Sequence, residues 1–168
     1  MTKIGTTVVY GTQVCKITDR RKQTIGKLTR EYYVLVPVFD RKNTIYVPVD
    51  NERLVAKMRK ILSPEEIHAL INALPETDSV WVTDDKQRTA EFKAVVEGGD
   101  PAEIIAVIKT LYERARELEA KGRRLHAVDE LILARAEKVV YEEFSLVLDI
   151  KRDEVVPFIA RQIEIANK

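Results

Sequence analysis

The pattern of apolar residues along the chain changes near residue 60. Before that point, short runs rich in β-branched and aromatic residues alternate with turn residues, which is typical of β-strands. Strands are predicted at 6–10, 14–21, 31–39 and 44–49, with turns at 22–27 and 40–43. Pro37 predicts a sheet-edge position for its strand, because proline cannot donate a ladder hydrogen bond. Four or five short strands predict a small SH3-like or Tudor-like β-barrel.

From residue 61 the apolar spacing becomes helical. Ser63-Pro64-Glu65-Glu66 combines an N-cap serine, proline at the first helical position and glutamate at the third, which predicts a helix that ends before Pro75. Three further helices are predicted from caps, glycines and apolar stripes: after Thr83 to Gly98, from Asp100-Pro101 through Leu118, and from about 127 to 148. In the last of these we expect six side chains to face inward: Leu131, Ile132, Val139, Val140, Phe144 and Val147. A final helix kinks or begins at Pro157.

The predicted fold class is therefore α+β, with a β-rich domain at 1–60 and an all-α helical bundle at 61–168. The helix at 61–75 and the polar linker at 76–82 fit either domain. A barrel of this size is marginal alone, so we expect it to pack against the helical part of the chain.

Charge is distributed unevenly between the two halves. Residues 1–60 hold 13 Lys and Arg against 5 Asp and Glu, a net charge of +8, and residues 61–168 hold 15 against 22, a net charge of −7. A basic first half fits nucleic acid or an acidic protein surface, and charge alone does not choose between them. The adjacent acidic pairs Asp84-Asp85 and Glu142-Glu143 are interpreted as solvated charges.

Residues able to carry out catalysis are scarce. The chain has one cysteine, Cys15, in a strand-like context that predicts a packing role, and only His68 and His126 as bases near neutral pH. It contains no motif typical of zinc, dinucleotide or P-loop sites. We therefore expect no enzyme activity, catalytic residue, metal, cofactor or small-molecule ligand. No apolar run is long enough for a membrane span and no signal peptide is evident, so a cytoplasmic protein is predicted.

Basic clusters supply the candidate binding residues. Arg20, Arg21 and Lys22 are expected on an exposed hairpin of the barrel. In the helical half six basic residues fall within sixteen positions: Lys109, Arg114, Arg116, Lys121, Arg123 and Arg124. Lysine and arginine that engage phosphates would give salt-sensitive binding, although an ordinary charged helix face explains the same residues equally well.

Trp81 is the only tryptophan and lies between the polar linker and the second predicted helix. Such a residue commonly packs a helix start against the core. The alternative is an exposed wedge at a DNA minor groove, with Lys86 and Arg88 as phosphate anchors.

A family resemblance is carried by short segments that occur in a fixed order along the chain. They are 4–5, 8–10, 31–35, 45–49, 62–66, 92–93, 99–101, 108–112, 125–127 and 136–138. Over about residues 3–150 the chain resembles the CarD-like transcription regulators, whose N-terminal module is shared with transcription-repair coupling factors.

The resemblance implies a Tudor-like domain that binds the β subunit of bacterial RNA polymerase, and we place Tyr46 with the basic hairpin in that interface. It also implies a helical domain that contacts promoter DNA, with a tryptophan that enters the minor groove and keeps the promoter open. Two alternatives stay open: a protein-only adaptor whose acidic helical domain recruits another protein, and a basic barrel that binds nucleic acid independently of polymerase.

Overall fold

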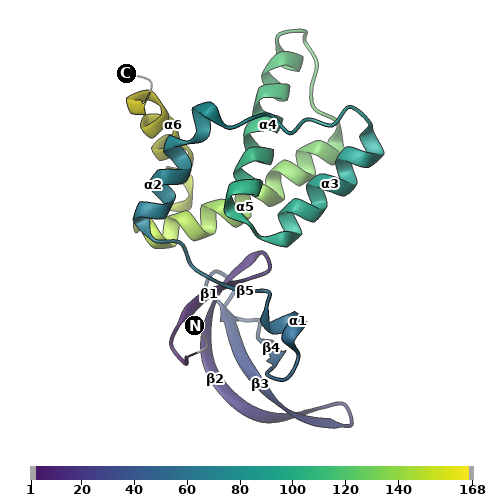
Figure 1. Ribbon diagram of the computed structural model, residues 1–168, viewed down its shortest axis with the longest axis vertical. Coiled ribbons are helices and arrows are strands. Elements are labelled where there is room, and N and C mark those ends of the chain that lie inside the picture. The colour runs from purple at the N-terminus through teal and green to yellow at the C-terminus, as the bar shows by residue number, and fades with distance from the viewer. Residues whose placement is uncertain (1–2, 167–168) are drawn as a thin grey trace. The chain divides into compact units, whose positions relative to one another are not determined.

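The protein folds into two compact units that divide between Ile61 and Leu62. The computed structural model describes the backbone of residues 3–166 and the side chains of residues 3–159 and 161 (Figure 1). Among these residues, no helix has an apolar stretch of the length that a bilayer requires. Strands predominate in the first unit and helices make up the second, which agrees with the predicted α+β class.

The first unit is built on one antiparallel sheet. Its strands are β1 (Thr7–Tyr10), β2 (Gln13–Ile25), β3 (Leu28–Pro37), β4 (Ile45–Pro48) and β5 (Met58–Lys60). The strand order β4-β3-β2-β1-β5 leaves β4 and β5 as the two edges, so the sheet is open and the closed SH3-like or Tudor-like barrel is not confirmed. A single-turn helix, α1 (Glu52–Val55), precedes β5 and was not predicted; Asn51 caps it by accepting from the Leu54 backbone N–H.

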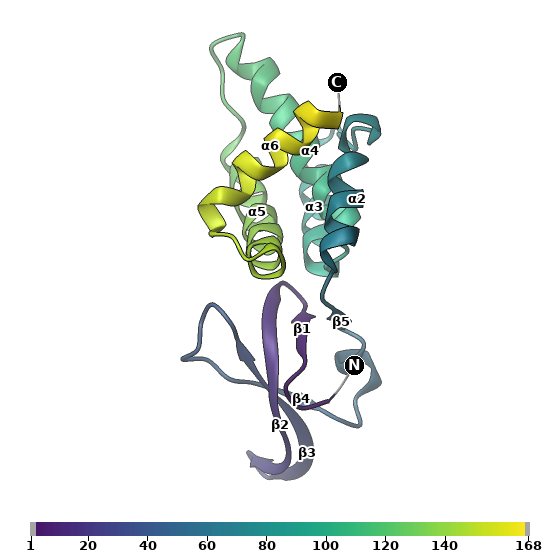
Figure 2. The same ribbon diagram turned by 90° about the vertical axis from the view of Figure 1, so that its left-hand side faces the viewer.

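The hairpin formed by β2 and β3 is longer than the sequence predicts (Figure 2). The predicted turn at 22–27 shortens to Gly26 and Lys27, where Gly26 adopts a φ of +67°. Polar residues continue the ladder because they pair across the strands, as in the 2.7 Å contact between the Thr24 and Thr29 hydroxyls. A register shift between Ile17 and Asp19 marks a bulge in β2, a feature that bends strands.

Pro37 does not place β3 at the edge of the sheet, since β3 lies between β2 and β4. The ladder with β4 reaches only Leu35, so Pro37 itself has a strand neighbour on one side, Cys15. Cys15 is fully buried and belongs, as expected, to a packed core. The buried members of that core are Val8, Cys15, Ile17, Tyr33, Leu35, Val47 and Met58.

The second unit contains five α-helices and two short 3-10 helices among the described residues. They are α2 (Pro64–Asn72), η1 (Leu74–Glu76), α3 (Asp85–Gly98), α4 (Pro101–Glu119), α5 (Ala127–Leu148), η2 (Arg152–Glu154) and α6 (Val155–Ala166). All of the α-helices contribute to one apolar core, with Phe92 and Phe144 among its largest buried side chains. Figure 1 and Figure 2 show α6 beside α2, where the rings of His68 and Phe158 meet edge-on with centroids 5.7 Å apart.

The starts of α2, α3 and α4 agree with the predicted ones, and the caps predicted at Ser63 and Asp100 are observed. Ser63 and Glu66 form both hydrogen bonds of a capping box at α2. The Asp84 carboxylate accepts from the Gln87 backbone N–H at α3, and the Asp100 carboxylate accepts from the Ala102 N–H at α4. Gly99 ends α3 with a φ of +75°, a conformation that suits glycine.

Two expectations for α5 are wrong. Leu131 is 68% exposed rather than inward-facing. Glu142 and Glu143 are buried rather than solvated, with exposures of 5% and 1%. The two glutamates are buried because α5 packs against several helices and buries a wide face there. The Glu143 carboxylate accepts a 2.9 Å hydrogen bond from the Leu62 backbone N–H, and the Glu142 carboxylate lies 3.6 Å from the Arg152 guanidinium.

Candidate functional site

Trp81 lies in residues 77–84, a stretch between η1 and α3 with no helix or strand, here called the Trp81 segment. In Figure 1 this segment passes alongside α4. Two consecutive residues of α4 hold it there. The Lys109 ammonium donates to the carbonyl oxygens of Leu74 (2.6 Å) and Thr77 (2.7 Å), and the Thr110 hydroxyl accepts from the Val80 backbone N–H (3.0 Å). The N-terminal half of the segment is therefore fixed by side chains rather than by regular structure.

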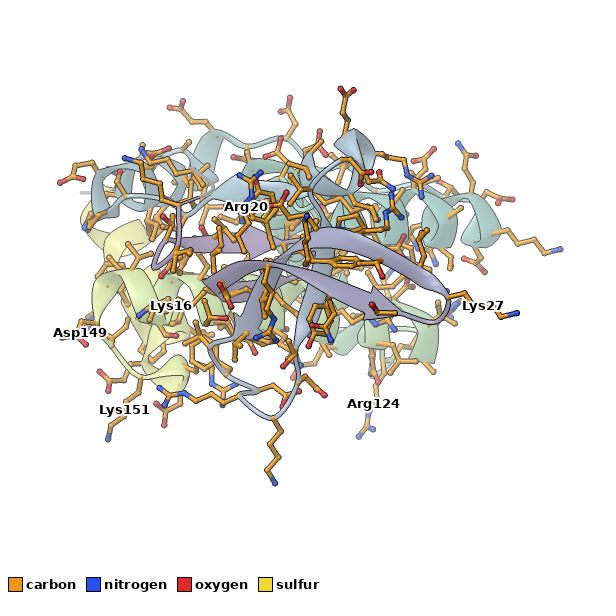
Figure 3. All side chains as sticks on the ribbon, turned by 90° about the horizontal axis from the view of Figure 1, so that it is seen from below. Lys16, Arg20, Lys27, Arg124, Asp149 and Lys151 are labelled. Carbon is orange, nitrogen blue, oxygen red and sulfur yellow. The ribbon has the colours of Figure 1, made fainter. Side chains whose placement is uncertain are left out.

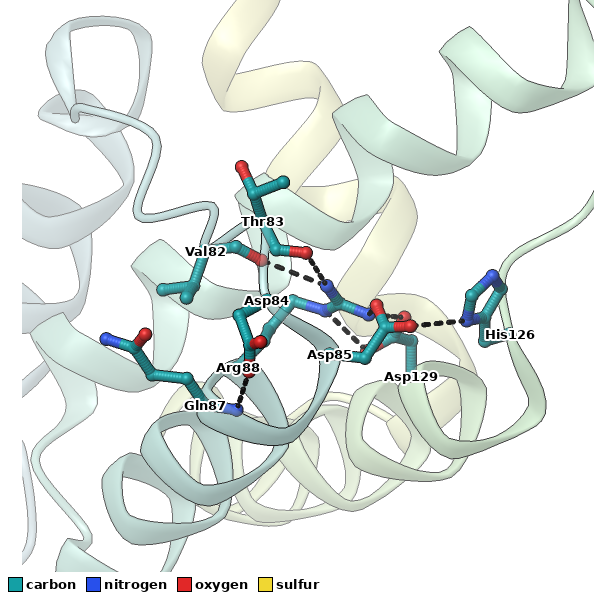
Figure 4. Close-up of polar contacts among 8 residues, drawn as sticks. All are labelled: Val82, Thr83, Asp84, Asp85, Gln87, Arg88, His126 and Asp129. Atoms are coloured by element: carbon teal, nitrogen blue, oxygen red, sulfur yellow. Dashed lines mark hydrogen bonds and ion pairs between the residues drawn. The ribbon is translucent and has the colours of Figure 1, made fainter.

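Arg88 holds the other half of the segment (Figure 4). Its Nη1 donates to the carbonyl oxygens of Val82 (2.9 Å) and Thr83 (3.4 Å), the two residues after Trp81. Its Nε and Nη2 donate to the two carboxylate oxygens of Asp129 on α5, at 3.0 and 2.9 Å, and Nη2 also donates to Asp85 at 2.8 Å. These five contacts match the five N–H donors of a guanidinium.

The ion pair between Arg88 and Asp129 is buried, with side-chain exposures of 3% and 2%. The hydrogen bond to Asp129 raises the pKa of the Arg88 guanidinium, and burial acts in the opposite direction. The two groups satisfy each other in a site with almost no solvent exposure. Breaking such a pair from one side leaves a buried charge without its partner.

Two guanidinium groups lie over the Trp81 ring. The Cζ atoms of Arg88 and Arg114 are 4.2 and 5.0 Å from its centroid, within the range of cation–π contacts. Trp81 is half-buried and packs against the helical core, so the packing role is observed. Beside it is a pocket of about 120 Å³ whose lining includes Arg123, Arg124 and His126.

The predicted DNA-binding residues divide into two groups. Trp81, Arg88, Arg114, Arg123 and Arg124 line the small pocket together. The remaining four do not line it: Lys86, Lys109, Arg116 and Lys121.

Exposure separates the same residues in a different way. Arg88 is buried and Lys109 is occupied by backbone carbonyls, so neither presents a free cation. Five others are exposed: Lys86, Arg116, Lys121, Arg123 and Arg124. Arg114 is intermediate; its Nη1 donates to Glu117 at 3.2 Å, whereas its buried Nε has no hydrogen-bond partner among the described residues. The Arg124 side chain extends away from the helical ribbon in Figure 3.

Arg20, Arg21 and Lys22 lie within β2 and are exposed, as expected, although not in a turn. Figure 3 shows Arg20 on β2 and Lys27 at the tip of the hairpin. The Arg20 Nε donates to Glu31 at 2.8 Å, and its Cζ lies 5.4 Å from the Tyr33 ring centroid. Tyr46 is on the edge strand β4, half-buried, with its ring edge-on to Tyr32 at 6.0 Å.

Asp129 and Thr110 were missed by sequence reasoning. An aspartate in the first turn of a helix is ordinarily explained by the helix dipole, and a threonine within an apolar stripe by packing. Asp129 is 41 residues from Arg88 and Thr110 is 30 residues from Val80. No local pattern indicates contacts of that kind.

Comparison with known proteins gives two family matches. Residues 2–62 match the CarD-like/TRCF RID domain, and residues 69–160 match the CarD C-terminal domain. The two matches are consecutive along the chain and cover most of it. A search of curated proteins found no match.

Proposed function

The chain belongs to the CarD-like family of non-enzymatic, RNA-polymerase-interacting transcription factors, and we propose that it binds the polymerase β subunit and promoter DNA. The first unit would hold the protein on bacterial RNA polymerase, and the second would contact DNA near the melting region. The result would be a change in the stability of the open promoter complex.

Polymerase binding by the first unit is supported by an available sheet edge and exposed cations. Strand β4 carries Tyr46 and has a strand neighbour on one side only. An edge of this kind can pair with an edge strand of a partner. The basic residues Arg20, Arg21 and Lys22 are exposed on β2, where they can steer the unit toward an acidic surface.

DNA binding by the second unit is supported above all by the placement of Trp81. The half-buried indole lies beside Arg114, and Arg123 and Arg124 line the same pocket. Neither Arg123 nor Arg124 has an ion-pair partner among the described residues, so their charges are available to phosphates. A protein held on polymerase meets nearby DNA at high effective concentration, so weak affinity in isolation is compatible with this function.

Titration calorimetry onto the purified β-subunit lobe tests the first contact. We expect wild-type protein to bind and the triple charge reversal Arg20→Glu, Arg21→Glu and Lys22→Glu to bind more weakly. A control variant reverses two exposed charges elsewhere in the unit, Arg53→Glu and Lys57→Glu, and is expected to retain binding. Absence of wild-type binding would refute the polymerase contact, and the basic unit would then be tested against DNA and RNA.

Trp81→Ala tests the second contact in a promoter-opening assay with polymerase, where the lifetime of the open complex is measured. We expect the variant to bind polymerase normally and to lose its effect on that lifetime. The net charge of −7 on residues 61–168 favours the competing function, a protein-only adaptor. An unchanged promoter effect in Trp81→Ala would favour that adaptor.

A further inference from the structure

We propose that Arg88, Asp129 and Thr110 are positioning residues that hold Trp81 in one fixed presentation. The inference rests on the proposed contact between Trp81 and DNA and specifies how the protein prepares it. It also assigns Arg88 a role different from the phosphate anchor that the sequence suggests. None of the three residues needs to touch DNA in this role.

The backbone on both sides of Trp81 is bound by side chains from the helices. On one side, the Val80 N–H donates to Thr110, which is 2% exposed and whose hydroxyl in turn donates to the Ala106 carbonyl oxygen. On the other side, the carbonyl oxygens of Val82 and Thr83 accept from Arg88. Trp81 therefore lies between two anchored points in a segment that has no regular structure of its own.

Arginine at position 88 is specifically suited to this task. Its planar fork reaches both carboxylate oxygens of Asp129 and still has donors for Asp85 and the two carbonyl oxygens (Figure 4). A lysine ammonium has three donors and no fork, so it cannot reproduce this set. The same guanidinium lies 4.2 Å from the Trp81 ring centroid, so the group that fixes the backbone also supports the indole.

The functional value of this arrangement is preorganisation. Ordering a free backbone costs conformational entropy, and a mobile Trp81 segment would lose that entropy when it binds. If a variant adopts the native presentation only about a tenth of the time, its apparent affinity at this contact falls about tenfold. In this protein the contacts of Arg88 and Thr110 order the Trp81 segment when the chain folds, so binding does not have to order it.

Trp81 is the only tryptophan, so selectively excited fluorescence of the intact protein reports on this site alone. The test variants are Arg88→Lys, Asp129→Asn and Thr110→Val. Lys93→Gln removes an exposed charge from the same helix and controls for electrostatics. Val139→Ala weakens the buried core further along α5 and controls for lost stability.

Circular dichroism first identifies conditions under which each variant is folded. Emission spectra and acrylamide quenching of the free protein are then measured under those conditions. We expect red-shifted emission and a larger quenching constant in the three test variants, and wild-type values in both controls. Retained wild-type fluorescence in Arg88→Lys and Asp129→Asn would overturn the inference, as would equal changes in Val139→Ala.

The same variants in the promoter-opening assay separate this inference from the proposed function. We expect Arg88→Lys to lose about tenfold in apparent affinity at the promoter while it still binds polymerase. If Trp81→Ala leaves promoter opening unchanged, the DNA function fails even where fluorescence shows the anchors to be real. If Trp81→Ala abolishes the effect and Arg88→Lys matches wild type in both assays, the positioning role fails and the function stands.

Discussion

Arg20 and Arg88 make the same two kinds of contact in different surroundings. Arg20 pairs with Glu31 at 2.8 Å and its Cζ lies 5.4 Å from the Tyr33 ring centroid; the paired side chains are 47% and 43% exposed. Arg88 pairs with Asp129 at 2.9 Å and lies 4.2 Å from the Trp81 centroid, with exposures of 3% and 2%. The ion-pair distances hardly distinguish the two arginines, whereas burial does.

Burial decides what each arginine can do. The Arg20 pair is in water, where an ion pair contributes little to stability and can exchange its partner for a new one. The Arg88 pair is enclosed, so exchanging one partner would leave an unpaired charge buried in the interior. An exposed arginine is thus suited to recognition, and a buried one to holding its neighbours in place.

The largest expected effect comes from breaking the buried pair on one side. Asp129→Ala leaves the Arg88 guanidinium in the interior without its main carboxylate, which should lower the unfolding free energy by about 3–5 kcal/mol. Urea denaturation of the full chain, monitored by circular dichroism, measures it. The double variant Arg88→Met with Asp129→Leu should recover much of that loss, and a double variant as unstable as the single one would contradict this account.

A smaller effect is expected from one buried hydrogen bond at the other anchor. Thr110→Val preserves shape and removes the hydroxyl that accepts from the Val80 N–H, which should cost about 1–3 kcal/mol. Thr89→Val, on α3, removes a hydroxyl that has no hydrogen-bond partner among the residues that the structure describes, and it serves as the control in the same denaturation experiment. Equal losses in the two variants would assign the cost to helix propensity rather than to the anchor.

Glu142 is a buried carboxyl whose distance to Arg152, 3.6 Å, is longer than the 2.9 Å between Arg88 and Asp129. Its effect is expected as a pH dependence of the unfolding free energy. Burial raises the pKa of its carboxyl, opposed by Lys138 and Arg152. The folded protein therefore binds this proton more tightly than the unfolded chain does. Between the ordinary glutamate pKa and the raised value, unfolding free energy should fall as pH rises. Glu142→Gln should flatten that slope in denaturation curves, and an unchanged slope would exclude Glu142 as its source.

The smallest effect on stability is expected at Arg20. Arg20→Ala breaks an exposed pair and should leave the unfolding free energy almost unchanged. The same variant should weaken binding to the polymerase β lobe in calorimetry. A stability loss as large as that of Asp129→Ala would show that exposure does not separate the two arginines.

Local sequence signals account for most of the elements. Ser63 with Glu66, Asp84 and Asp100 mark helix starts because a cap satisfies backbone groups within a few residues of itself. The turn at Gly26 is narrower than predicted because cross-strand pairing extends both strands into polar sequence. Leu131, Glu142 and Glu143 were misplaced because helical periodicity identifies a face but not the number of neighbours that cover it.

The sequence by itself determined four of the strands and the helices that follow them, the change of pattern near residue 60 and the family resemblance, all of which depend on residue type and spacing. It also singled out Trp81 and the basic residues as candidates. Only the tertiary structure decided which of those cations are accessible and which one is enclosed. Arg88 differs from Arg20 through Asp129, an aspartate 41 residues away, and through the helices that exclude water around the pair. Burial is a property of packing among distant segments, and no local pattern contains it.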